Sequence, residues 1–395
     1  MLPRSLCRPR WLSMHAPPDT VSTAETRKAT NVPRTKARQG DGLARSCSVL
    51  VETSLVAGLS VGYNFVLWSI FACTLLWFAL SRSRYLNYYG IFCRQGHLGA
   101  GSHAAPGECY YFLNRSREQI GMMTHLFAII PCCFLLFFQF VPSIRQKSAM
   151  FHRANGYIII LLISIAVAGG LMASRRSFGG DSAFQATNVL LSSLVVVGLA
   201  QAVINIKRLQ IEQHRAWMLR VWFWAFSVVT MRIIQAVASH AVSGRGYTAM
   251  RPCAQIDSDG VLPAATILQA WPECAAYFSR VAPGQQALVG ADYNGLPIEV
   301  NVALSLVSGI SALLALLLHA VGVEIYLYMT SAESERLRQI SYHKQLAAGM
   351  RHPVRTGMAV SRFGNAAKWR MRVNAAKTGN DSDVTHGGAS DEEAT

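Results

Sequence analysis

The hydrophobic pattern of this chain consists of six long apolar stretches separated by polar segments. About 20 helical residues, each rising 1.5 Å, are enough to cross a bilayer. The stretches are Leu55–Leu80, Ile120–Val141, Gly156–Ser174, Ala186–Ile206, Trp217–Val242 and Val300–Met329. Because a helix satisfies its own backbone hydrogen bonds in lipid, the pattern predicts an all-α, polytopic transmembrane bundle of six helices.

Basic residues crowd the two short loops that follow the second and the fourth stretch. They are Arg145, Lys147 and Arg153 in one loop, and Lys207, Arg208 and Arg215 in the other. The positive-inside rule therefore predicts that both termini and these two loops are cytoplasmic, and that loops 81–119 and 243–299 lie outside. Four arginines near the predicted outer ends go against the rule: Arg82, Arg84, Arg175 and Arg176.

Composition agrees with a membrane protein. Of the 395 residues, 51% are hydrophobic and 15% are charged, whereas soluble domains carry roughly one quarter charged residues. The net charge of +16 comes mainly from the two tails and a few loops. No nucleic-acid recognition motif accompanies this charge, so we expect the basic cytoplasmic segments to contact anionic lipid of the bilayer and not nucleic acid.

The chain is predicted to have three regions. Residues 1–50 form a disordered basic tail, and residues 51–330 form the transmembrane domain. Residues 331–395 form a cytoplasmic tail that is helical at first, over 331–350, and largely disordered afterwards. Prolines interrupt the Arg-rich N-terminal segment, so a plasma-membrane or endomembrane location is favoured over a mitochondrial one.

Four cysteines lie in the two long loops that are predicted to be outside. They are Cys93 and Cys109 in the first loop, and Cys253 and Cys274 in the fifth. In an oxidising compartment the two cysteines of each loop would pair, although four free thiols are an alternative. A Cys253–Cys274 disulfide would hold the fifth loop as a small folded lid, and such loops often carry function.

Two predicted helices open with similar motifs, Phe151-His152-Arg153-Ala154 and Gln213-His214-Arg215-Ala216. The shared His-Arg-Ala triplet suggests that helices two and three are duplicated as helices four and five. Together with His125 and Thr230-Met231-Arg232, these motifs resemble the family of predicted membrane proteins catalogued as domain of unknown function 2306 (DUF 2306). The resemblance covers about residues 120–240 and implies a membrane architecture without a particular activity. Tyr157 departs from it, because the family more commonly has Arg there.

Polar side chains inside a bilayer are costly, so they mark candidate sites. Arg232 is about ten residues, or roughly 15 Å, from the outer end of its helix, and Gln235 shares its helix face. No acidic residue in helices one to four could balance this arginine. A bound anion, a haem propionate or the carbonyls of neighbouring helices would have to do so. One hypothesis is therefore a carrier, receptor or channel-like protein with a ligand site between helices two to five. Its residues would be Arg232, Gln235, His125 and Gln201.

The histidines offer a second hypothesis. Two lie near the predicted outer face and two near the inner face, namely His125 with His240 and His152 with His214. Imidazoles on facing helices can bind haem iron axially, so the protein could hold haem b and transfer electrons across the membrane, as cytochromes of the b561 kind do. A lone intramembrane histidine is, however, more often a core residue than a ligand.

A third hypothesis is a structural or regulatory membrane protein without any ligand, whose basic tails are interaction surfaces. The sequence contains no phosphate-binding loop, no dinucleotide fingerprint, no HExxH motif and no CxxC pair. These absences argue against an enzyme. The three hypotheses therefore differ in the role that they give to polar residues of the transmembrane helices.

Overall fold

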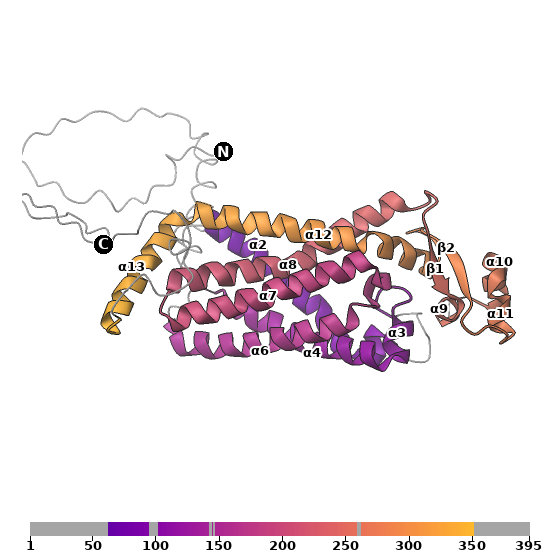
Figure 1. Cartoon of the computed structure of the whole chain (residues 1–395), viewed down its shortest axis with the longest axis horizontal. Helices are drawn as coiled ribbons and strands as arrows, with labels where there is room; N and C mark the ends of the chain where they lie inside the picture. The colour runs from indigo at the N-terminus through magenta and orange to yellow at the C-terminus, as the bar shows by residue number, and fades with distance from the viewer. Residues whose placement is uncertain (1–61, 95–101, 142–143, 145–146, 259–261, 351–395) are drawn as a thin grey trace, which may run out of the picture. The chain divides into compact units, whose positions relative to one another are not determined.

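The structure is a computed structural model that describes residues 62–94, 102–141, 144, 147–258 and 262–350 (Figure 1). The predicted N-terminal tail, most of the C-terminal tail and Arg145 lie outside the described residues. The described residues fall into two compact units. The first contains the residues up to Ser193 together with Ser227–Leu316, and the second contains Leu194–Phe226 together with the residues from Leu317.

Six helices are long and apolar enough to span a membrane, which confirms the predicted fold class. They are α2 (Gly62–Ser83), α4 (Ser116–Gln139), α6 (Ala149–Ala173), α7 (Ser182–Lys207), α8 (Ile211–Val242) and α12 (Pro297–Met329) (Figure 1). Five of these helices begin earlier than the predicted stretches, and the difference is largest for α6, which begins at Ala149, and for α8, which begins at Ile211. The apolar pattern marks only the part of a helix that lipid covers, whereas polar first turns at the interface continue the same hydrogen-bonded backbone.

In the first unit, glycines let α4 and α6 approach closely. A Cβ atom on Gly121 would lie 2.6 Å from the Cβ of Met172, and one on Gly169 would lie 2.6 Å from the carbonyl oxygen of Gly121. Both distances are shorter than real side chains tolerate. Small residues at such interfaces give the close backbone packing on which helix association in lipid depends. This packing fixes His125 of α4 against α6.

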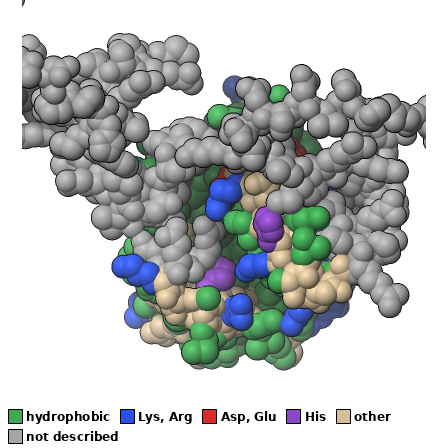
Figure 2. Space-filling view, turned by 90° about the vertical axis from the view of Figure 1, so that its left-hand side faces the viewer, with side chains coloured by type: hydrophobic (Ala, Val, Ile, Leu, Met, Phe, Trp, Pro, Cys, Tyr) green, Lys and Arg blue, Asp and Glu red, His purple; other side chains and the backbone are tan. Residues whose placement is uncertain are grey.

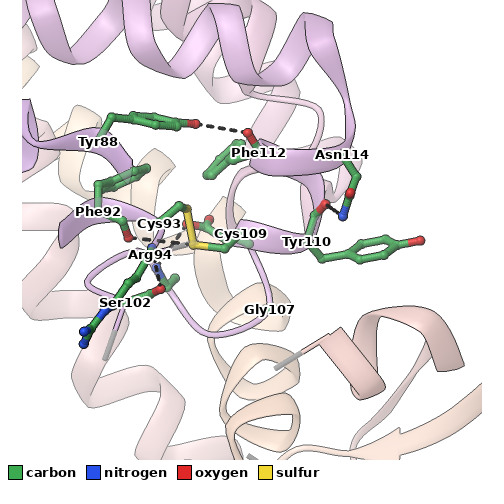
Figure 3. Close-up of a disulfide and its surroundings, with 12 residues drawn as sticks. Tyr88, Phe92, Cys93, Arg94, Ser102, Gly107, Cys109, Tyr110, Phe112 and Asn114 are labelled. Carbon is green, nitrogen blue, oxygen red and sulfur yellow. Dashed lines mark hydrogen bonds between the residues drawn. A yellow bond between two sulfur atoms is a disulfide. The ribbon is translucent and has the colours of Figure 1, made fainter. Parts of the chain in front are cut away.

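Loop one folds into short helical segments that a disulfide holds together. It contains η2 (Arg84–Leu86), the π-helical turn η3 (Tyr88–Phe92) and α3 (Cys109–Asn114). The Cys93–Cys109 disulfide joins the end of η3 to the start of α3 (Figure 3). The Tyr88 hydroxyl donates a hydrogen bond of 3.2 Å to the carbonyl of Phe112, beside the buried rings of this loop. The segment before α3, which contains Gly107 and Glu108, is thereby fixed.

Loop five forms a small subdomain, as expected of a folded lid. Its elements are β1 (Thr248–Pro252), α9 (Cys253–Ser258), α10 (Ala264–Ala270), η5 (Pro272–Cys274), α11 (Ala275–Phe278) and β2 (Gln286–Gly290). The two strands pair antiparallel, and Met250 lies opposite Leu288. The Cys253–Cys274 disulfide lies in the core of the subdomain. The structure thus contains both disulfides that the sequence suggested.

Loop five is bound to loop one by polar contacts inside the first unit. The Gln255 side chain donates a 3.0 Å hydrogen bond to the carbonyl of Gly107 and accepts one from the Tyr111 hydroxyl. The Asn301 amide, in the second turn of α12, donates a 2.6 Å hydrogen bond to the carbonyl of Pro106. These contacts hold the residues that precede α3, including Glu108.

The second unit contains α13 (Ser331–Ala347), which lies where a helical extension of the sixth helix was predicted. Arg220 forms a salt bridge with Glu324 at 2.6 Å. Although Glu324 is exposed, its pairing with Arg220 joins α12 to α8 within this unit. Figure 2 views the end of the molecule where α13 lies, and many of the described charged side chains in view are Lys or Arg.

Candidate functional site

Arg232 of α8 lies against the turn that connects α6 with α7. Its guanidinium carbon is 4.2 Å from the centroid of the Phe178 ring, and Phe178 belongs to the 3-10 turn η4 (Ser177–Gly180). Arg232 therefore lies beside the turn that joins α6 to α7. Helix α8 continues for ten more residues to Val242, and Ser243 just beyond it donates a hydrogen bond to Asp292 of loop five.

The guanidinium of Arg232 lacks the partners that a structural arginine would have. The Arg232 side chain is exposed in the structure. Among the described residues, none accepts a hydrogen bond from the guanidinium or forms a salt bridge with it. Arginine carries five N–H donors and keeps its charge. The alternative of an arginine bonded to the carbonyls of neighbouring helices therefore finds no support in the described part of the chain.

An acidic residue that was not predicted from the sequence lies near Arg232. Glu108, in loop one, is 4% exposed and acts electrostatically on Arg232. Its carboxylate accepts a 2.5 Å hydrogen bond from the backbone N–H of Phe178 and a 3.2 Å hydrogen bond from that of Ala105. Burial raises the pKa of Glu108 to about 7, although the N–H of Phe178 and the charge of Arg232 both lower it. Loss of hydration thus outweighs the favourable contacts of the ionised form.

Further polar side chains surround Arg232 in the first unit. Arg82, in the last turn of α2, acts electrostatically on Arg232 and donates a hydrogen bond to the hydroxyl of Tyr85. The charge of Arg232 also acts electrostatically on His125 of α4. We call Arg232, Phe178, Glu108, Arg82 and His125 the Arg232 cluster. Five separate segments contribute to it, and it contains more basic than acidic groups.

The turn at Phe178 has an unusual backbone. Phe178 has a φ of +50°, and the next two residues, Gly179 and Gly180, have φ values of +77° and +68°. A bulky residue in this left-handed region is strained, and such strain clusters at ligand clamps and switches. The hydrogen bond from the Phe178 N–H to Glu108 holds the turn in place. Arg251 of loop five lies against it as well, because its Nη2 would be 3.0 Å from a Cβ atom on Gly179.

The other residues of the predicted ligand site have different surroundings. Gln235 is 2% exposed, and its amide donates a 3.2 Å hydrogen bond to the carbonyl of Leu304. It therefore joins α8 to α12 within the first unit, one helical turn after Arg232. Gln201 belongs to the second unit, where its carbonyl accepts a hydrogen bond from the side chain of Asn205. Of the four predicted ligand residues, Arg232, Gln235 and His125 belong to the first unit and Gln201 belongs to the second.

Two of the four candidate haem histidines make the same kind of contact. Nδ1 of His125 lies 2.8 Å from the carbonyl oxygen of Ala166, and Nδ1 of His214 lies 2.9 Å from that of Ala202. Since a carbonyl only accepts, each Nδ1 carries the proton and each Nε2 carries the lone pair. This is the tautomer that a metal-ligating histidine usually has. Among the described residues, no group of three or more His, Cys, Asp or Glu is arranged to hold a metal ion.

The other two histidines make different contacts. His152 accepts a 3.1 Å hydrogen bond from Gln139 through its backbone carbonyl. The ring of His240 packs on that of Tyr293, with 4.2 Å between their centroids.

The fold defines a polytopic α-helical membrane protein, and six helices in the described part of the chain are long and apolar enough to span a bilayer. Residues 122–255 match the model of the family described as predicted membrane protein (DUF2306), which confirms the predicted resemblance. No curated protein and no solved structure matches the chain. The matched segment includes Arg232, Phe178 and His125, whereas Glu108 and Arg82 precede it.

Proposed function

We propose that this protein binds a small anionic group at the Arg232 cluster, as a carrier, receptor or channel-like protein would. The supporting observation is the guanidinium of Arg232, which has no hydrogen-bond acceptor among the described residues. An ionised side chain within an apolar span is costly unless something balances its charge. An oxyanion would balance the charge and accept several of the five N–H donors at once.

The surroundings of Arg232 favour an organic anion. Arg82 adds a second positive charge nearby, while Glu108 is buried below the Phe178 turn and directs its oxygens to backbone N–H groups. The Phe178 ring offers an apolar face beside the guanidinium. A carboxylate, sulfate or phosphate group on a partly apolar molecule would fit both features. Such a group could belong to a free solute or to a lipid headgroup.

Sulfate binding to the full-length protein tests the proposal. We would measure it by calorimetry in nanodiscs of neutral lipid, for the wild type and for Arg232→Gln. The substitution should weaken binding about ten- to hundredfold, because it removes charge-assisted hydrogen bonds that contribute roughly 1.5–3 kcal/mol. Arg245→Gln is the matched control, because Arg245 is an exposed arginine just after α8. It should leave the affinity unchanged.

A second arm distinguishes the two sources of the anionic group. Nanodiscs with increasing phosphatidic acid should abolish sulfate binding if a lipid headgroup occupies Arg232, and should leave it intact if a free solute does. Equal sulfate affinity in the wild type and Arg232→Gln, or no saturable binding in either, would reject the proposal. Arg232 would then be a structural residue of a protein without a ligand, which is the remaining alternative from the sequence.

The haem hypothesis is a second candidate, because the Nδ1–carbonyl contacts of His125 and His214 leave Nε2 as the basic nitrogen. Bound haem would supply one-electron chemistry, and each of these two imidazoles would be a candidate ligand within its own unit. A visible spectrum of the purified protein, oxidised and then reduced with dithionite, tests this. A sharp reduced b-type band that His125→Ala removes and His343→Ala keeps would favour it, since His343 is an exposed histidine of α13. A colourless protein from haem-replete cells would exclude it.

A further inference from the structure

The buried carboxyl group of Glu108 interacts with both Phe178 and Arg232 of the Arg232 cluster. Its Oε1 accepts a hydrogen bond from the backbone N–H of Phe178, with 2.5 Å between the nitrogen and the oxygen. The ring of the same Phe178 lies over the guanidinium of Arg232 at 4.2 Å. Any change in the charge of Glu108 therefore acts on Arg232 twice, directly through its electric field and indirectly through the position of the Phe178 ring.

We infer that Glu108 is a proton-operated switch that controls the binding of an anion at Arg232. While ionised, Glu108 holds the Phe178 turn over Arg232 and offsets the charge of the guanidinium. When Glu108 takes up a proton from water, both restraints weaken and Arg232 becomes available to an anion. Anion binding is then coupled to the uptake of one proton. This inference rests on the proposed function and adds its regulation.

The contacts of the two forms differ in strength. A carboxylate accepts a backbone N–H about twice as strongly as a neutral carboxyl oxygen does, so protonation loosens the bond to Phe178. That residue is held at a φ of +50°, where a bulky side chain is strained. When the hydrogen bond from Phe178 to Glu108 is weaker, the turn can relax more easily from its strained backbone conformation. Gly179 and Gly180, which follow it, tolerate backbone rotation.

The charge balance also changes. Glu108 is the acidic group that acts on Arg232, whereas Arg82 adds to the positive field there. When Glu108 is neutral, its negative charge no longer offsets the two guanidinium groups, and Coulomb attraction favours an anion. Other groups that act on the cluster are the hydroxyls of Tyr88, near Glu108, and of Tyr85, near Arg232, together with His125. Arg251 lies against the same turn, and Asp181, which ends the turn, accepts hydrogen bonds from the Phe184 N–H and the Ser308 hydroxyl.

The switch operates in an accessible pH range. Burial raises the pKa of Glu108 to about 7, so small changes around neutral pH alter its charge. If the anion binds only the protonated form, its apparent affinity falls with the protonated fraction. Between about pH 5.5 and about pH 8.5 this fraction changes about 30-fold for a pKa of about 7, so the sulfate affinity should change by up to the same factor.

Two measurements on the full-length protein test the switch. The first is an infrared difference spectrum between about pH 5.5 and about pH 8.5, where a protonated carboxyl group gives its own C=O band. The band should titrate near neutral pH, disappear in Glu108→Gln and persist in Glu118→Gln. Glu118, in the first turn of α4, is the matched control because it lies outside the cluster and is less buried.

The second measurement is sulfate affinity at the same two pH values. The wild type and Glu118→Gln should bind more tightly at the lower pH, whereas Glu108→Gln should bind with nearly the same affinity at both. Absence of a carboxyl titration that depends on Glu108 would overturn the inference, even if Arg232 binds sulfate. Equal wild-type affinity at both pH values would overturn the coupling. Failure of the proposed function is recognised separately, because Arg232→Gln would then bind sulfate as the wild type does.

Discussion

The carboxylate of Glu108 accepts a 2.5 Å hydrogen bond from the backbone N–H of Phe178. This bond joins loop one to the turn between α6 and α7, and it brings an acidic group near Arg232 of α8. Three segments that are far apart in the sequence thus meet around one titratable side chain. The stability of the protein should therefore depend on the protonation of that side chain.

Stability should fall as the pH rises from about 4.5 to about 7. The folded-state pKa of Glu108, about 7, exceeds its ordinary value of 4.5, so the folded protein binds more protons than the unfolded chain in this interval. Full ionisation should reduce the free energy of unfolding by about 3 kcal/mol. Denaturant unfolding in detergent at several pH values measures this. Glu108→Gln should flatten the profile, whereas a profile like that of the wild type would contradict the prediction.

Replacing Gly169 with Ala should destabilise the contact between α4 and α6. The new Cβ atom would lie 2.6 Å from the carbonyl oxygen of Gly121 and 2.6 Å from the backbone nitrogen of His125. Overpacking of this kind costs about 1–3 kcal/mol. Gly322→Ala in α12 is the control, because nothing lies within 4 Å of its Cβ position. It should be neutral or slightly stabilising, and equal melting temperatures for the two variants would refute the predicted close packing.

Replacing Gln235 with Leu should lower stability without abolishing sulfate binding. The substitution removes the 3.2 Å hydrogen bond to the carbonyl of Leu304, and hydrogen bonds between membrane helices contribute about 0.6 kcal/mol on average and up to about 1.7 kcal/mol. Thermal unfolding and calorimetry give the two quantities. Loss of sulfate binding in a well-folded Gln235→Leu protein would mean that the ligand site includes Gln235 after all.

Each disulfide should stabilise the protein by about 3 kcal/mol, since the two bonds close loops with separations of 16 and 21 residues. Replacing Cys93 and Cys109 with Ser should therefore lower the melting temperature. Replacing Cys73, an exposed free cysteine of α2, with Ser should leave the melting temperature unchanged. A double variant that melts with the wild type under oxidising conditions would show that the bond contributes nothing.

The sequence predicted the spanning helices well, because lipid imposes a simple requirement. Long apolar stretches must be helical where the backbone has no water to bind, so α2, α4, α6, α7, α8 and α12 were all expected. The helix starts were less well predicted. His214 and Arg215 lie inside α8, which begins at Ile211, because a polar first turn interrupts the apolar pattern without ending the helix.

The site was predicted only in part. Arg232 and His125 were identified, since polar groups in an apolar stretch stand out. Glu108 was missed because it lies in a polar loop, and its approach to Arg232 depends on how the Cys93–Cys109 disulfide and loop five fold that loop. One signal was present in the sequence: Glu108 is the sole acidic residue between Leu80 and Arg115. Sequence alone cannot say that such a residue is buried.

The contacts between loop one and loop five also set an order of assembly. Gly107 and Pro106 emerge during synthesis before α4 begins, but their partners Gln255 and Asn301 follow only after five helices have been made. Since chains fold from the N-terminus as they are synthesised, loop one must wait for most of the protein to enter the membrane. The segment that holds Glu108 in place is thus completed last, and a chain stalled before residue 301 would contain five of the six described spanning helices but would lack the Asn301 contact that fixes this segment.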